Sequence, residues 1–171
     1  MSALAVGRLK TRAILALGGN LGDREATIKA AIKSLDKHPK IAVKQVSELV
    51  ESHAVTKEGL SYTEPNYLNC VIEVSTSLKP KELLSALNEV ENEFGRVRIE
   101  RWAARTLDID IITYGLELVE TKSLVIPHPR AFERAFVLVP WAQMDSDAVL
   151  PGHGKVADLA GDLADQVWFY K

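Results

Sequence analysis

The sequence lacks the features that would place it among secreted, membrane or disulfide-bonded proteins. It has one cysteine in 171 residues, while 47% of its residues are apolar, so a core of ordinary size can form without disulfides or a structural metal. It contains no run of about 20 consecutive apolar residues, and its start, MSALAVGRLKTR, lacks the long apolar core of a secretion signal. We therefore expect a cytoplasmic protein with no membrane partner.

A strong excess of positive charge is also absent. The chain carries 21 lysine and arginine residues against 23 aspartate and glutamate residues, a net charge of −2, which argues against a general nucleic-acid binder. No internal repeat or low-complexity segment divides the sequence. We expect a loose N-terminal extension over residues 1–11, a single domain over residues 12–171, and a monomer.

The sequence does contain a pair of aspartates on a predicted short strand. In the segment Leu107–Ile111, Asp108 and Asp110 alternate with three aliphatic residues, so the two carboxylates point to one side of the strand and the aliphatic side chains to the other. Two carboxylates this close are costly without a cation, and paired oxygen ligands suit Mg²⁺. The alternative is that both aspartates face solvent on an edge strand and pair with nearby arginines.

An arginine-rich segment leads directly into this strand. Residues 95–111 read GRVRIERWAARTLDIDI, and the irregular spacing of the arginines predicts a loop. Guanidinium groups bind phosphate oxygens in pairs and offset the charge that develops during phosphoryl transfer. Taken alone, the arginines would belong to a solvated face and Trp102 to a core, but beside the aspartates they indicate a polyphosphate site over which Trp102 closes. The arginines are Arg96, Arg98, Arg101 and Arg105.

Apolar periodicity and turn residues predict the other elements. Alternating apolar runs predict strands, and apolar residues at helical spacing predict two helices, the first capped by Asp23 and the second begun by Pro80. A polar, turn-rich stretch before the third strand predicts a loop. The predicted strands are residues 12–17, 41–51, 67–77 and 107–111, the helices run from Asp23 to His38 and from Pro80 to Phe94, and the loop is 54–65.

This β-α-β-β-α-β order over the first 114 residues predicts an α+β protein of the ferredoxin-like type, in which two helices cover one face of an antiparallel sheet. The second and third predicted strands are expected to pair antiparallel. A C-terminal hairpin of residues 117–119 with 124–126 and short helices, one opened by residues 127–130 and one over 155–165, complete the prediction. Because this fold serves many functions, it does not indicate the chemistry.

Several short segments outside the arginine and aspartate block also stand out. They are Gly18-Gly19-Asn20-Leu21-Gly22, Tyr67-Leu68-Asn69, Pro127-His128-Pro129-Arg130 and Glu133-Arg134-Ala135-Phe136. Read in order with the block, they resemble the 6-hydroxymethyl-7,8-dihydropterin pyrophosphokinase family of folate biosynthesis, from about Ala13 to Pro140. The resemblance implies that the pterin hydroxymethyl oxygen attacks the β-phosphorus of ATP, that AMP leaves, and that Asp108 and Asp110 hold two Mg²⁺ ions.

The resemblance also implies roles on the nucleotide side. The catalytic residues that it implies are Arg96, Arg98, Trp102, Arg105, Asp108 and Asp110. The ATP contacts that it implies are Glu91, Arg96, Arg105, His128 and Arg134. Without the resemblance, His128 between two prolines would be an exposed loop histidine and Glu91 a helix-surface glutamate.

A flat heteroaromatic pterin needs aromatic faces and polar edges to bind it. Tyr67 and Asn69 lie on one face of their predicted strand, opposite the apolar face that contains Leu68 and Cys70, so a ligand can reach them. Taken alone, Tyr67 would be a core aromatic and Asn69 a strand residue facing water, while Cys70 belongs to the core. The pterin contacts that the resemblance implies are Tyr67, Asn69, Phe136 and Val55.

The chain departs from the family pattern at three places. Gly19 stands where serine is common, Ala103-Ala104 replaces a frequent Gly-Pro, and the stretch Ser52–Val55 lacks the prolines often found there. The last difference leaves the pterin-edge contacts open. No side chain is a clear general base, because a carboxylate that holds a metal ion accepts a proton poorly.

Two other functions fit part of the pattern. A ferredoxin-like module that binds RNA phosphates would use the arginines, but it leaves the aspartate pair without a cation and predicts a more basic surface. A simple Mg²⁺-dependent kinase that releases ADP shares the metal and the arginines, but it gives no role to Tyr67, Asn69 and Phe136.

Overall fold

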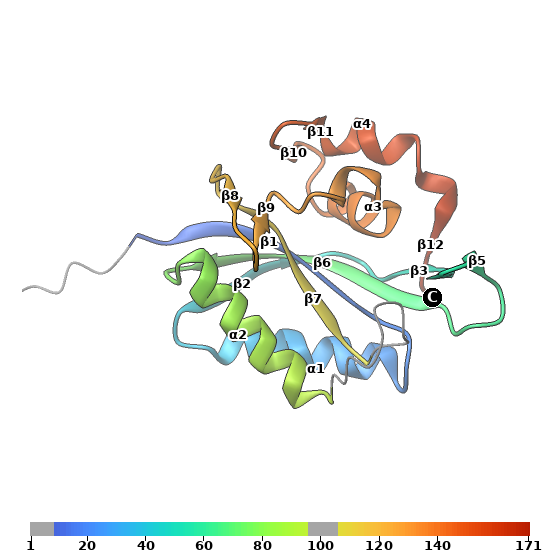
Figure 1. Ribbon diagram of the computed structural model, residues 1–171, viewed down its shortest axis with the longest axis horizontal. Coiled ribbons are helices and arrows are strands. Elements are labelled where there is room, and N and C mark those ends of the chain that lie inside the picture. Colours follow the sequence, from blue (N-terminus) through green and yellow to red (C-terminus); the bar gives the residue numbers. More distant parts are fainter. Residues whose placement is uncertain (1–8, 96–105) are drawn as a thin grey trace, which may run out of the picture.

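The computed structural model describes residues 9–95 and 106–171, and an antiparallel sheet forms its centre (Figure 1). The strands of this sheet are β1 (Thr11–Gly19), β2 (Ile41–Val46), β3 (Val50–Ser52), β6 (Tyr67–Thr76), β7 (Asp108–Tyr114) and β12 (Val167–Phe169). They follow the order β12-β3-β6-β1-β7, and β2 also pairs with β6. The predicted antiparallel pairing of 41–51 with 67–77 is therefore confirmed.

Helices α1 (Arg24–Lys37) and α2 (Pro80–Glu93) cover one face of the sheet (Figure 1). Each helix joins two strands that have one other strand between them: α1 joins β1 to β2 across β6, and α2 joins β6 to β7 across β1. Alternate residues of β1, such as Leu15 and Leu17, point to this face and pack with Leu68 and Ile72 of β6. The period of two in the strands thus builds the larger core.

A second helical layer covers the opposite face. Helices α3 (Ala135–Met144) and α4 (Val156–Gly161) pack there, against the alternate set of strand residues that includes Ile14, Val71 and Ile112. The prediction that helices cover one face was incomplete. The α3 sequence, AFVLVPWAQM, is apolar on almost every side, so its periodicity does not reveal which side is buried.

The ends of the first two helices follow the predicted signals. The Oδ1 atom of Asp23 accepts a hydrogen bond from the Ala26 N–H at 3.1 Å, which confirms the predicted cap of α1. Pro80 is the first residue of α2, and the Glu82 carboxylate accepts from the Lys79 N–H at 2.7 Å. Gly95 follows α2 with a φ of +74°, a left-handed conformation that favours glycine.

Three segments differ from the predicted secondary structure. The predicted strand 41–51 is divided into β2 and β3, and between them Ser47 Oγ accepts from the Val71 N–H at 2.9 Å. The predicted loop 54–65 contains a hairpin of β4 (Ala54–Thr56) and β5 (Gly59–Ser61). The tail adds β12, which pairs with β3. The break at Ser47 and the addition of β12 depend on contacts distant in sequence, which local patterns do not record, whereas the β4–β5 hairpin is local.

The C-terminal hairpin and helices are close to the prediction. Strands β8 (Val119–Glu120) and β9 (Val125–Ile126) form the expected pair. The 3-10 helix η1 (Ala131–Glu133) follows residues 127–130, and η2 (Ala164–Gln166) follows α4. Strands β10 (Val149–Leu150) and β11 (Gly154–Lys155) form a further small hairpin.

Of the predicted N-terminal extension, residues 1–11, the first eight residues lie outside the described residues. Its last residue, Thr11, is already the first residue of β1. Among the helices of residues 9–95 and 106–171, none has the length and apolar character needed to cross a membrane.

We predict that Cys70 does not react with a thiol reagent in the folded protein. Cys70 is fully buried in the core, and burial raises the pKa of its thiol to about 12. Labelling near pH 8 should require denaturant. Because only the unfolded chain loses this proton between about pH 9 and pH 12, the free energy of unfolding should fall more steeply with pH there than in Cys70→Ala. Rapid labelling of the native protein would contradict this burial.

Candidate active site

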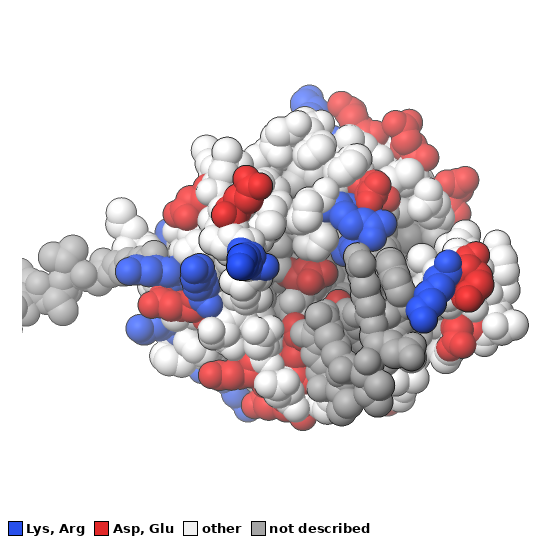
Figure 2. Space-filling model, in the orientation of Figure 1, with Lys and Arg blue, Asp and Glu red and all other residues white. Residues whose placement is uncertain are grey.

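The two aspartates lie on β7, at one edge of the sheet. Asp108 and Asp110 are half-buried, while Ile109 and Ile111 are buried in the core beneath α1 and α2. The alternation predicted from the sequence is therefore present, and both carboxylates lie on the sheet face that carries α3. Figure 2 shows acidic side chains in the middle of this view of the molecule, with basic side chains next to them.

Two residues from one later segment approach the carboxylate of Asp110. Arg134 Nη1 lies 3.7 Å from Asp110 Oδ2, and His128 Nε2 lies 4.0 Å from the same oxygen. Arg134 immediately precedes α3, and His128 lies in the connection that follows β9. The segment 127–134 thus brings two side chains to an aspartate that is distant in sequence.

His128 is uncharged at neutral pH and presents its Nε2 atom to the site. Burial, reinforced by the positive charges of Arg134 and Arg130, lowers the pKa of His128 to about 4. Its Nδ1 atom accepts a hydrogen bond from the Arg130 N–H at 3.1 Å, so the proton of the neutral ring is on Nε2. Its side chain is only 19% exposed, so the reading as an exposed loop histidine is wrong. His128 can donate a hydrogen bond without adding charge.

Arg134 links the aspartate to an aromatic side chain. Its guanidinium carbon lies 5.5 Å from the ring centroid of Phe136, within the range of a cation–π contact. Burial lowers the pKa of Arg134, while the neighbouring Asp110 acts in the opposite direction. Because arginine remains charged in proteins, Arg134 supplies a fixed positive charge between a carboxylate and an aromatic face.

Glu91 is buried and contacts the aspartate strand through its backbone. Its side chain is on the last turn of α2 and is 1% exposed, so the alternative of a helix-surface glutamate is wrong. Glu91 Oε1 accepts a hydrogen bond from the Ile109 N–H at 3.3 Å. Ile109 lies between Asp108 and Asp110, so this bond ties α2 to the strand at the position between the two carboxylates.

The pterin residues implied by the resemblance come from three elements. Tyr67 begins β6 and is half-buried, and Asn69 is 5% exposed. Phe136 is half-buried against a small cluster that contains Val50, and Val50 pairs with Asn69 across β3 and β6. The structure therefore brings Phe136 and Asn69 to one neighbourhood. Val55 lies on the separate β4–β5 hairpin and is 47% exposed.

Three polar or small residues around this group were not assigned a site role from the sequence. Ser52 is buried, and its Oγ atom accepts a hydrogen bond from Asn69 Nδ2 at 3.4 Å. Asn20, also buried, donates from Nδ2 to the Pro65 carbonyl at 3.1 Å and so joins the turn after β1 to the loop before β6. Gly18 pairs with Asn69. In the sequence, the glycine-rich turn was the one feature that drew attention to Gly18 and Asn20.

The arginine segment itself is outside the described residues. The predictions for Arg96, Arg98, Arg101, Trp102 and Arg105 therefore remain predictions. The described residues on either side of it do belong to the candidate site, because α2 carries Glu91 and β7 begins at Asp108.

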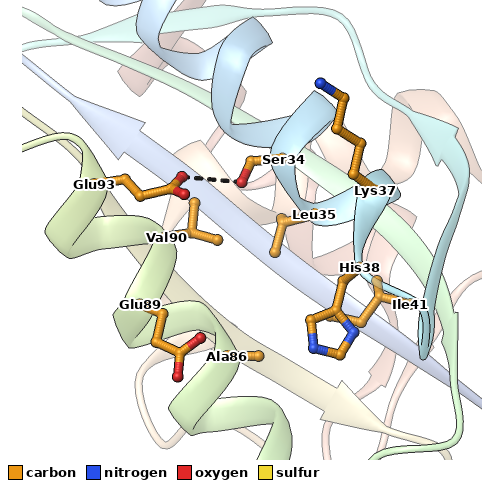
Figure 3. Close-up of a pocket in the computed structure, with 9 residues that line it drawn as sticks. All are labelled: Ser34, Leu35, Lys37, His38, Ile41, Ala86, Glu89, Val90 and Glu93. Atoms are coloured by element: carbon orange, nitrogen blue, oxygen red, sulfur yellow. Dashed lines mark hydrogen bonds between the residues drawn. The ribbon is translucent and has the colours of Figure 1, made fainter.

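A hollow of about 220 Å³ lies elsewhere, between α1 and α2 (Figure 3). Its floor includes Leu35 and Val90, and at its rim Ser34 Oγ donates to Glu93 Oε2 at 3.0 Å. Since α1 and α2 cover the sheet face opposite Asp110, this hollow is not part of the candidate site.

Comparison with known proteins identifies relatives over most of the chain. Residues 14–146 match the model of the 7,8-dihydro-6-hydroxymethylpterin-pyrophosphokinase family. A relative from Bacillus subtilis (strain 168), named 2-amino-4-hydroxy-6-hydroxymethyldihydropteridine pyrophosphokinase, is 42% identical over 132 residues, 77% of each protein. A relative of the same name from Haemophilus influenzae is 37% identical over 160 residues, 90% of this chain and 93% of the relative.

A solved structure is similar in fold. The crystal structure of wild-type HPPK-DHPS from Plasmodium falciparum with pteroate superposes with a TM-score of 0.72 over 95% of this chain, at 13% identity. The chain spans 44% of the length of that protein chain. At this identity the likeness supports the fold alone.

We predict that Glu91→Ala destabilises the protein and that Glu91→Gln does so less. Alanine leaves the Ile109 N–H without this acceptor, which costs about 1–3 kcal/mol for a buried group, whereas glutamine retains a carbonyl oxygen at that position. Urea unfolding should order the variants in this way, with Glu89→Ala, an exposed position on the same helix, as the matched control. Equal unfolding midpoints for Glu91→Ala and the control would contradict the prediction.

Proposed function

The chain belongs to the 7,8-dihydro-6-hydroxymethylpterin-pyrophosphokinase family, and we propose that the residues gathered around Asp110 carry out the reaction of that family. The chain transfers pyrophosphate from ATP to 6-hydroxymethyl-7,8-dihydropterin, a step of folate biosynthesis. The observation that supports the location is the approach of Arg134 and His128 to the same carboxylate oxygen of Asp110, at 3.7 and 4.0 Å.

Asp108 and Asp110 are the proposed ligands of two Mg²⁺ ions. Their carboxylates are the oxygen ligands that Mg²⁺ prefers, and both are half-buried on one side of β7. Within residues 9–95 and 106–171, no group of three or more histidine, cysteine, aspartate or glutamate side chains could hold a metal ion. This fits Mg²⁺, which usually takes its other ligands from phosphates and water. When bound, the ions would offset the charge on the phosphates.

Arg134, His128 and Glu91 are the described residues proposed for the ATP side. Arg134 carries a fixed charge suited to a phosphate oxygen, and the neutral His128 ring can donate from Nε2. Glu91 is proposed to act through the backbone of β7, because its carboxylate is buried against Ile109. The same proposal includes four residues outside the described ranges, which are Arg96, Arg98, Trp102 and Arg105.

Tyr67, Asn69 and Phe136 are proposed to hold the pterin, with Val55 as a further contact. The two aromatic side chains supply flat apolar faces, and the Asn69 amide can both donate and accept at the pterin edge. The support is that Asn69 and Phe136 lie next to the same strand, β3, through Val50. Because Phe136 also contacts Arg134, the pterin side adjoins the nucleotide side.

In the proposed reaction a bond forms between the pterin hydroxymethyl oxygen and the β-phosphorus of ATP. The bond between that phosphorus and the oxygen bridging to the α-phosphate breaks, and AMP leaves with the bridging oxygen. The hydroxyl proton is lost in the same conversion, and we assign no side chain to accept it. The contribution of the protein is to hold both substrates in line and to stabilise the developing charge.

The architecture is proposed to be the ferredoxin-like arrangement in one domain over residues 12–171. Support comes from the strand order and from the two helices that each cross one intervening strand. A monomer is proposed because helices of the same chain cover both faces of the sheet. A cytoplasmic location agrees with the single buried cysteine.

The identity of the product formed from ATP tests this proposal. The purified chain is incubated with ATP, Mg²⁺ and 6-hydroxymethyl-7,8-dihydropterin, and AMP is resolved from ADP by chromatography. We expect AMP in amounts equal to the pterin diphosphate, with none formed when the pterin or the metal is omitted. ADP would indicate simple phosphoryl transfer, and absence of any nucleotide product would reject the proposed enzyme activity.

We predict that Asp110→Asn lowers turnover by at least about 100-fold, the scale expected for loss of a preorganised charge contact. The substitution preserves the shape of the side chain, so the thermal midpoint should stay close to that of the wild type. Asp147→Asn, at an exposed position, is the matched control and should retain full activity. A fully active Asp110→Asn variant would show that the site has been misplaced.

A further inference from the structure

Gly18 lies in a row between a proposed pterin residue and a proposed metal ligand. On one side of β1, Gly18 pairs with Asn69 of β6, and on the other side it pairs with Asp108 of β7. Residues paired directly across strands have side chains on the same face. Asn69, Gly18 and Asp108 therefore form one row on the face that carries α3, and Gly18 is the member without a side chain.

The space that a side chain at position 18 would need is already taken by Asn69. A Cβ atom built on Gly18 would lie 2.2 Å from Asn69 Oδ1 and 3.2 Å from Asn69 Cγ. Both distances are shorter than ordinary van der Waals contact, and the first is far inside it. Gly18 does not have a left-handed backbone conformation, so the position needs glycine for room and not for its φ angle.

Asn69 has little freedom to move away from such a Cβ atom. Its side chain is 5% exposed, and its Nδ2 atom donates to Ser52 Oγ at 3.4 Å. With the nitrogen held on the β3 side, the Oδ1 atom extends over Gly18 toward β7. A methyl group at position 18 would therefore rotate or displace the amide.

The row also sets the distance between the two halves of the site. Neighbouring strands are about 4.7–4.9 Å apart, so the Asn69 and Asp108 backbones are separated by roughly 9–10 Å. A pterin whose edge is bound by Asn69 must present its hydroxymethyl group, over this distance, to a phosphate held near Asp108. Because Gly18 has no side chain, the Asn69 amide can extend over β1 toward that phosphate.

We propose that Gly18 is a positioning residue for the pterin, because the absence of a side chain lets the Asn69 amide lie over β1, on the side toward Asp108. This inference rests on the proposed function. In this inference Gly18 affects the binding of the pterin through Asn69 and has little effect on the binding of the nucleotide.

The test is Gly18→Ala, with Gly161→Ala as the matched control. Gly161 ends α4, has nothing within 4 Å of a built Cβ atom and has no left-handed φ. The measurements are the KM of each substrate, kcat, and binding of the pterin by calorimetry. We expect pterin binding to weaken at least about tenfold in Gly18→Ala, the cost of one misplaced polar contact, with the KM for ATP changed less than about twofold. The control should match the wild type.

A second comparison separates this effect from general damage to the fold. In an Asn69→Ala background the obstructing amide is absent, so adding Gly18→Ala should cause no further loss of pterin binding and no further loss of thermal stability. This comparison decides the matter even if Gly18→Ala alone fails to fold.

The inference is overturned if Gly18→Ala binds the pterin as the wild type does, or if its effect persists unchanged in the Asn69→Ala background. Failure of the proposed function would look different, because the wild-type chain itself would then bind no pterin and release no AMP.

Discussion

The antiparallel register of β1 with its two neighbours is the constraint on which the candidate site depends. It places Asn69 and Asp108 opposite the same residue of the central strand. A shift of one residue in either pairing would turn one of these side chains into the core beneath α1 and α2. The alternating apolar residues of β1, β6 and β7 prevent that shift, because each strand buries a complete row in that core. The hydrophobic pattern therefore also fixes the polar geometry.

Charge at the edge strand is balanced by groups of different kinds. Asp110 faces the permanent charge of Arg134 and the neutral ring of His128. The carboxylate of Glu91 approaches the strand from α2 and accepts a hydrogen bond from the Ile109 N–H. The contact between Arg134 and Asp110, at 3.7 Å, is longer than a close charge-assisted hydrogen bond.

The sequence allowed prediction of those features that follow from local periodicity. Alternation around Asp108 and Asp110 predicted their common face, and Asp23 predicted the start of α1. The burial of Glu91 was not predictable in the same way, because it depends on how α2 packs against β7. The second helical layer was missed because α3 is apolar on most sides. The need for glycine at position 18 arises from a contact with Asn69, 51 positions away in the printed sequence, and no local pattern records it.

The most direct test of the account is a crystal structure of the chain with Mg²⁺, a non-hydrolysable ATP analogue and 6-hydroxymethyl-7,8-dihydropterin. The account predicts Mg²⁺ bound to both Asp108 and Asp110, the pterin edge hydrogen-bonded to Asn69, and the hydroxymethyl group directed over Gly18 toward the β-phosphorus. A pterin bound away from Asn69, or a metal ion that contacts neither aspartate, would contradict it.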